Sequence, residues 1–261
     1  LDVFELSSDF GDRLAAALGR LNPGKTSFIS VDENDTYLEL LEEIRRTPRY
    51  AHLNYPSVVL YPHQERALFD SLNRNPVRVI LADEVGLGKT IEAGAVIKYL
   101  IDFQQLDSAV IMVPASVLLQ FQEEISAFFG LDFYRWDSAG REFISVTGER
   151  LSATGKKNPL HVGSPKYLVI SSQYARGSTS RADIFAEAEW LPELLVVDEA
   201  HGARVHPDGE GGVKPTLLWR TINSVAPKIR NLLLLTATPL QIDPLEFHGL
   251  LKLIGLGPVW D

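Results

Sequence analysis

The sequence predicts an α/β fold in which a mostly parallel sheet lies between layers of helices. From Leu60 onward, short apolar runs alternate with segments of helical periodicity. Strands that are apolar along their whole length are typical of parallel sheets covered on both faces. Strands that alternate with helices indicate a sheet built from βαβ units. These observations place the main domain at residues 59–261.

The predicted elements follow one another in a regular order. Five apolar runs are expected to form strands, at residues 77–81, 109–113, 167–171, 194–197 and 232–235. A helix is expected over residues 91–103. Two more are marked by apolar residues that share one face, namely Ala67, Leu68 and Leu72 in the first and Val117, Leu118, Phe121, Ile125 and Phe128 in the second.

Residues 1–58 differ from the rest and predict an N-terminal helical extension. Apolar residues from Phe10 to Leu21 recur at helical spacing, and a second amphipathic helix is expected to end at Pro48. Two interpretations stay open. The extension is either a docking or linker element or a packed flank of the main domain.

Composition limits the classes of protein. The 261 residues include no cysteine and no apolar run long enough to cross a membrane, and the N-terminus lacks a signal-peptide pattern. We therefore expect a soluble, cytoplasmic protein with no membrane partner. With 25 basic against 34 acidic residues the net charge is −9, so this chain alone should bind nucleic acid weakly.

The segment from Leu81 to Thr90 predicts a phosphate-binding loop, because it ends an apolar strand and opens a helix. Gly86 and Gly88 allow close backbone approach, and unpaired N–H groups at a helix start attract phosphate oxygens. Lys89 is expected to contact the outer phosphates, and the Thr90 hydroxyl to bind magnesium. The usual first Gly is replaced by Asp83. The alternative is a Gly-rich helix start without a ligand.

A second candidate site is Asp198-Glu199-Ala200-His201, which follows the apolar run 194–197. Beside a phosphate loop, Asp198 can hold magnesium, and Glu199 can orient and deprotonate the attacking water. Alone, the acidic pair would equally suit a solvated strand end. His201 is either a coupling residue or a hydrogen-bonded structural histidine.

Two further segments complete the set of motifs. Gln64, at the start of a predicted helix, carries the donor and acceptor that complement an adenine edge, although a solvated glutamine is the alternative. The strand 232–235 runs into Thr236-Ala237-Thr238-Pro239, whose hydroxyl groups can bridge the acidic pair to a moving element. Ordinary turn chemistry would also explain that segment.

Taken in order, these motifs resemble those of superfamily 2 helicase-like ATPases. Asp-Glu-Val-Gly-Leu-Gly-Lys-Thr, followed by Ile91 to Gly94, is similar to the SWI/SNF-related branch, and within it to bacterial RNA polymerase-associated recycling ATPases. The resemblance runs from Leu60 to Ile254. It includes 113–121 and 169–172, which match segments that touch the nucleic-acid backbone in this family.

The resemblance implies a RecA-like lobe that binds ATP and Mg²⁺ and translocates on double-stranded DNA without separating the strands. It implies catalytic roles for Lys89, Asp198 and Glu199 and metal binding by Thr90 and Asp198. The residues expected to bind ATP are Gln64, Asp83, Glu84, Val85, Gly86, Leu87, Gly88, Lys89, Thr90 and Ile91. Phe121 stands where a Trp is common, and Gly202 to Val205 departs from the usual polar sequence.

Family members carry a second RecA-like lobe that supplies arginines to the transition state, and this chain is expected to be the first lobe only. The isolated lobe should therefore be weakly active or inactive as an ATP hydrolase. Besides DNA and the second lobe, candidate partners are RNA polymerase and phage-defence proteins. The competing hypotheses are a strand-separating DNA or RNA helicase and a nucleotide-sensing interaction module.

Overall fold

The described part of the chain forms one α/β unit. A computed structural model describes residues 57–82, 86, 88–153, 155–178, 182–207, 212–237 and 244–255. All but the last two residues of the predicted extension 1–58 lie outside these ranges, so that extension and its boundary at residue 59 stay predictions.

The main sheet has eight strands in the order β1-β10-β7-β2-β6-β3-β4-β5. Neighbouring strands are parallel from β1 through β3, and β4 and β5 add antiparallel pairs at one end. This confirms the predicted mostly parallel sheet. Its strands are β1 (Arg78–Ala82), β2 (Ala109–Val113), β3 (Tyr134–Asp137), β4 (Glu142–Ile144), β5 (Arg150–Ser152), β6 (Tyr167–Ser171), β7 (Leu194–Val197) and β10 (Asn231–Thr236).

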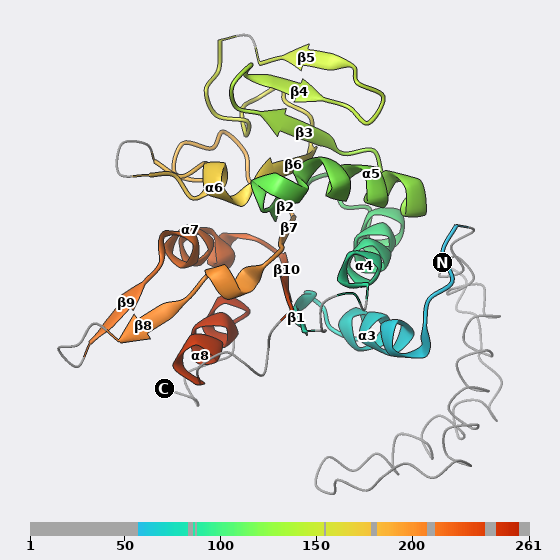
Figure 1. Ribbon diagram of the computed structural model, residues 1–261, viewed down its shortest axis with the longest axis vertical. Helices are drawn as coiled ribbons and strands as arrows, with labels where there is room; N and C mark the ends of the chain where they lie inside the picture. The colour runs from blue at the N-terminus through green and yellow to red at the C-terminus, as the bar shows by residue number, and fades with distance from the viewer. Residues whose placement is uncertain are drawn as a thin grey trace, which may run out of the picture. The chain divides into compact units, whose positions relative to one another are not determined.

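Helices cover both faces of this sheet, as in a RecA-like lobe. Figure 1 shows α3, α4 and α5 on one face and α6, α7 and α8 on the other. The α-helices are α3 (Pro62–Leu72), α4 (Lys89–Gln104), α5 (Leu118–Phe129), α6 (Ser172–Ala175), α7 (Leu217–Val225) and α8 (Pro244–Leu253). Short 3₁₀ turns are η2 (Ala115–Val117), η3 (Ala200–Gly202) and η4 (Ala226–Lys228), and a separate hairpin pairs β8 (Val205–Pro207) with β9 (Val213–Pro215).

The central strands form where the sequence predicted them because their side chains are apolar on both faces. Every residue of β2, β7 and β10 is buried. The predicted bounds of β2, β6 and β7 are confirmed residue for residue, whereas β1 is shifted by one residue and β10 is longer by one at each end. No described helix is long and apolar enough to span a membrane.

Close packing between α4 and α5 explains a small departure from the predicted helix face. The buried face of α5 includes Leu118, Phe121, Ile125 and Phe129, and Phe128 is only partly buried. A Cβ atom on Gly94 of α4 would lie 2.2 Å from the Phe129 ring. The absent side chain at Gly94 therefore leaves the space that Phe129 occupies.

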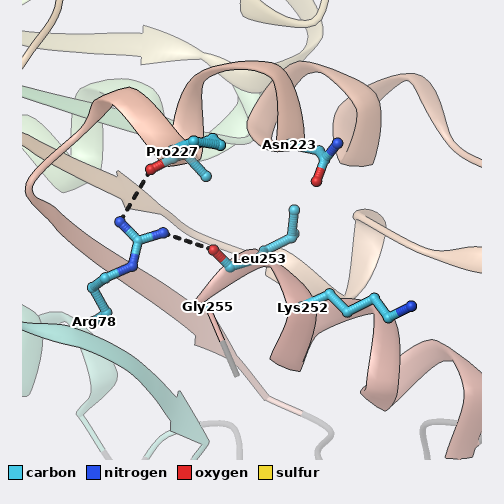
Figure 2. Close-up of a pocket in the computed structure, with 7 residues that line it drawn as sticks. Arg78, Asn223, Pro227, Lys252, Leu253 and Gly255 are labelled. Carbon is cyan, nitrogen blue, oxygen red and sulfur yellow. Dashed lines mark hydrogen bonds between the residues drawn. The ribbon is translucent and has the colours of Figure 1, made fainter. Parts of the chain in front are cut away.

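Arg78, at the edge of the sheet where β1 begins, forms hydrogen bonds to the ends of two helical segments. Its guanidinium donates to the carbonyls of Ala226 (3.1 Å), Ile229 (2.9 Å), Leu253 (2.8 Å) and Ile254 (3.1 Å). Figure 2 shows it between the end of α8 and η4, which follows α7. Burial lowers the pKa of this guanidinium. A cavity of about 300 Å³ lies here, but all its lining residues are at the edge opposite the predicted motifs.

Candidate active site

The turn between β1 and α4 is the predicted phosphate loop. Gly86 and Gly88 both adopt a φ of +89°, in the left-handed region that glycine tolerates. The Gly88 carbonyl accepts hydrogen bonds from the amides of Ile91 (2.8 Å) and Glu92 (3.1 Å), so the loop leads directly into the first turn of α4. This helix start favours an anion. The predicted loop residues Asp83, Glu84, Val85 and Leu87 lie outside the described residues.

Three predicted site residues occupy the first turn of α4. The helix begins at Lys89, two residues earlier than the sequence pattern indicated, and continues through Thr90 and Ile91. All three residues are partly exposed. Their side chains are therefore held by a rigid 16-residue helix and stay accessible to a ligand at its amino end.

Gln64 lies against this loop although it is 25 residues away from Lys89 in sequence. A Cβ atom on Gly88 would be 2.4 Å from Gln64 Nε2, so the two residues touch. Gln64 is only 3% exposed, and its Oε1 accepts from the Tyr61 amide at 2.9 Å. The glutamine is thus buried and oriented, not the solvated side chain of the alternative interpretation.

The acidic pair follows β7, at the same edge of the sheet as the phosphate loop. β10 lies between β1 and β7, with Ala82 beside Thr236 and Leu234 beside Val197. The Asp198 amide continues the ladder by donating to the Met112 carbonyl at 2.8 Å. The ends of β1, β10, β7 and β2 therefore meet at one edge, which is where ligands bind in open α/β sheets.

The Asp198 carboxyl is influenced by burial and by the charges of other residues, including that of Lys89 at the phosphate loop. Burial raises the pKa of the Asp198 carboxyl above its usual value, and the charge of Glu199 adds to the rise. A hydrogen bond from the Glu199 backbone and the positive charge of Lys89 act in the opposite direction. The charge of Lys89 thus acts on Asp198, although the two residues are 109 positions apart in sequence.

Glu199 is held in an unusual conformation beside His201. It adopts φ +51° and ψ +45°, a left-handed conformation that costs stability in a residue with a side chain. Its Oε2 lies 2.9 Å from Nδ1 of His201. Such strained conformations are concentrated at functional sites, and here the contact directs the carboxylate toward the histidine.

A polar network that the sequence did not predict supports the segment after the acidic pair. Arg204 Nε donates to the His201 carbonyl at 2.6 Å and lies 3.8 Å from Glu246 Oε2 in α8. The other Glu246 oxygen lies 3.0 Å from Nδ1 of His206 in β8. Arg204 and Glu246 are 42 positions apart in sequence, so no helical or strand periodicity relates them.

The two segments expected at a nucleic-acid backbone lie side by side. β2 and β6 are paired neighbours that end together at Val113 and Ser171. Gln173 Oε1 accepts from the Ala115 amide at 3.0 Å, and Ser171 Oγ accepts from the Tyr174 amide at 3.0 Å. The first bond joins η2 to α6 and the second caps the start of α6, so both segments lie at the edge that carries the acidic pair.

The predicted metal residues suit magnesium better than a metal held by protein alone. No group of three or more His, Cys, Asp or Glu side chains that could hold a metal occurs among the described residues. Magnesium usually takes one or two carboxylates and completes its shell with water and substrate phosphates. Asp198 and the Thr90 hydroxyl fit that donor set.

In the last predicted motif, Thr236 is buried at the end of β10, and Thr238 and Pro239 lie outside the described ranges.

The fold and these motifs define a helicase-like ATPase lobe. The sequence-family model of the SNF2-related domain matches residues 63–261, so the chain belongs to that family. Among its relatives is the RNA polymerase-associated protein RapA of Vibrio cholerae serotype O1 (strain M66-2), 34% identical over 202 residues. RapA of Erwinia tasmaniensis is 32% identical over 195 residues.

These matches cover most of this chain and a small part of each relative. The first covers 77% of this chain and 19% of the Vibrio protein, and the second 75% and 18%. The chain thus spans about a fifth of the length of these relatives. A similar solved structure is the Sulfolobus solfataricus SWI2/SNF2 ATPase core in complex with dsDNA, with a TM-score of 0.52 and 19% identity over 77% of this chain and 36% of that one. At 19% identity, this structural similarity supports the fold alone.

Proposed function

We propose that this chain is the first motor lobe of an ATP-dependent translocase or remodeller acting on double-stranded DNA. The observation that carries this proposal is that Lys89, at the start of α4, lies at the same edge of the sheet as Asp198 and Glu199, which follow β7, and that its charge acts on Asp198. Membership in the SNF2-related family adds support. The relative solved with dsDNA and the RNA polymerase-associated relatives suggest DNA as the track and RNA polymerase as a candidate partner.

The nucleotide would lie over the amino end of α4. Backbone amides at that helix start and the Lys89 ammonium would bind the phosphates of ATP. Gln64, already oriented by the Tyr61 amide, would face the adenine. Thr90 and Asp198 would hold magnesium, which neutralises charge on the outer phosphates. Gly86, Gly88 and Ile91 would complete this binding surface.

Glu199 would act as the general base. Its carboxylate lies at the same sheet edge as Lys89 and would take a proton from the water that attacks the outer phosphate. His201, 2.9 Å from Glu199, would limit the positions available to that carboxylate. The bond from Arg204 to the His201 carbonyl would hold the histidine in turn, which makes Arg204 a positioning residue.

Two substitutions test the proposal because they separate binding from hydrolysis. Hydrogen bonds to charged groups contribute about 1.5–3 kcal/mol, so Lys89→Ala should weaken ATP binding by about 10- to 100-fold. Glu199→Gln should retain ATP and lower DNA-stimulated turnover in the full-length protein by about 10²- to 10⁴-fold, the usual contribution of a general base. Titration with a fluorescent ATP analogue and a steady-state ATPase assay measure the two quantities.

Lys98→Ala is the matched control, because Lys98 lies on the same helix and pairs with Asp102 at 3.1 Å. It should change neither quantity. If Lys89→Ala and Glu199→Gln also left both unchanged, the site assignment would be wrong. A Glu199→Gln protein that keeps its full biological effect would favour the nucleotide-sensing module, and strand displacement by the full-length protein would favour a helicase.

A further inference from the structure

The antiparallel end of the sheet brings extra basic residues to the edge that carries the motifs. β5 and β3 are both antiparallel to β4, so they run in the same direction, and β3 is parallel to β6. The ends of β3, β5 and β6 therefore point to one edge. In Figure 1 their arrowheads point toward the side where α6 lies.

Two hydrogen bonds hold the neighbouring loops against each other and against α6. The Ala153 amide, just after β5, donates to the Arg141 carbonyl at 3.0 Å. The Tyr174 hydroxyl in α6 donates to the Lys157 carbonyl at 2.7 Å. Because α6 directly follows β6, the backbones of these loops are fixed beside the segment that includes Ser171.

One segment of this region, residues 150–166, is basic although the whole chain is acidic. Residues 150–166 include four Lys or Arg and no Asp or Glu, in a chain whose net charge is −9. Arg141, Lys157 and Arg176 are exposed, and no ion pair within the described residues involves any of them. Lys156, in contrast, pairs with Glu189 at 2.7 Å. Three cations are thus available to an external anion.

Arg141 occupies a position that is unfavourable for its type. Its φ of +52° is in the left-handed region, where glycine or asparagine is usual in a turn between strands. A long cation at such a position costs folding stability. A gain in binding would compensate for that cost.

We infer that Arg141, Lys157 and Arg176 form a basic patch that binds the phosphate backbone of double-stranded DNA. This patch extends the track beyond η2 and the start of α6, on the side of the sheet end formed by β3 to β5. The inference rests on the proposed function, because DNA must first lie on this edge. Duplex DNA carries closely spaced phosphates, so a duplex on the two predicted segments would continue past α6.

The salt dependence of DNA binding tests the patch. Each phosphate contact contributes about 0.9 to the slope of log K against log salt concentration. In the full-length protein, the double variant Arg141→Ala/Lys157→Ala should therefore lower that slope by about two and weaken binding about tenfold or more at low salt. Fluorescence anisotropy of a labelled duplex gives both values.

The matched control is Arg74→Ala/Lys228→Ala. It removes one Arg from the loop before β1 and one Lys from the end of η4 before β10, at the opposite edge. It should keep the parent slope, and Arg141→Lys/Lys157→Arg should restore it. Equal losses in both double variants, or no loss in the patch variant, would overturn the patch while leaving the proposed function intact. A full-length parent protein that binds no duplex DNA would overturn both. Titration with a fluorescent ATP analogue should give parent affinity in every variant, which shows that each is folded.

Discussion

At the edge proposed as the active site, single residues carry a cost to stability. Asp198 has a raised pKa because burial penalises its charge, and Glu199 has a left-handed backbone. Neither property favours folding. The identity of both residues follows from the sequence pattern, but their energetic state does not, because burial and φ depend on neighbours from other elements.

The raised pKa of Asp198 predicts a gain in stability on neutralisation. A carboxyl whose folded pKa is raised stabilises the fold below its unfolded pKa, near 3.8, and this contribution is lost as pH rises through the folded pKa. At pH 7 without nucleotide, Asp198→Asn should therefore melt at a higher temperature than the parent. A gain of about 1 kcal/mol corresponds to a rise of about 2–4 °C.

Thermal melts at several pH values measure this gain, which should shrink as pH falls toward 4. Glu199→Gln at the more exposed neighbouring carboxyl serves as the comparison. A lower melting temperature for Asp198→Asn at pH 7 would show that the ionised form is needed for folding.

Elements of this lobe differ in how well their sequences specify them. The buried strands β2, β6 and β7 were predicted correctly because a continuous apolar run is needed wherever both faces are covered. β3, β4 and β5 were not predicted. β4 and β5 have three residues each, which is too short for a periodic pattern, and all of β5 is exposed.

The contact between α4 and α5 gives a prediction at this scale. Alanine normally stabilises a helix interior by about 1 kcal/mol over glycine. At Gly94 the new methyl would lie 2.2 Å from the Phe129 ring, and such overpacking costs about 1–3 kcal/mol. Gly94→Ala should therefore lower the free energy of unfolding, measured by urea denaturation.

A second substitution checks the cause of that loss. Gly94→Ala/Phe129→Leu should be less destabilised than the sum of the two single variants, because the smaller side chain makes room for the methyl. Additive losses would mean that Phe129 is not the source of the strain.

At the scale of the whole molecule, the proposed reaction is expected to need a second lobe. The chain spans about a fifth of the length of its RapA relatives and has a net charge of −9. Arginines supplied from an opposite side accelerate phosphoryl transfer by about 10³- to 10⁵-fold. We therefore expect the isolated 261-residue chain to bind ATP but to hydrolyse it slowly, even with duplex DNA.

An ATPase assay at saturating DNA measures that rate, and the full-length protein provides the comparison. The full-length protein should hydrolyse ATP about 10³- to 10⁵-fold faster than the isolated chain. Brisk DNA-stimulated turnover by the isolated chain would show that the described lobe already holds a complete site.

The linear order of residues was sufficient to predict the parallel sheet and to place the candidate phosphate loop and acidic pair at the ends of their strands. Each depends on local chemistry, such as an apolar run, a glycine beside a lysine, or carboxylates after a strand. The contact of Gln64 with Gly88, the influence of Lys89 on Asp198 and the pair of Arg204 with Glu246 join elements far apart in the chain. Strand order and helix packing create these contacts, so no spacing in the sequence contains them.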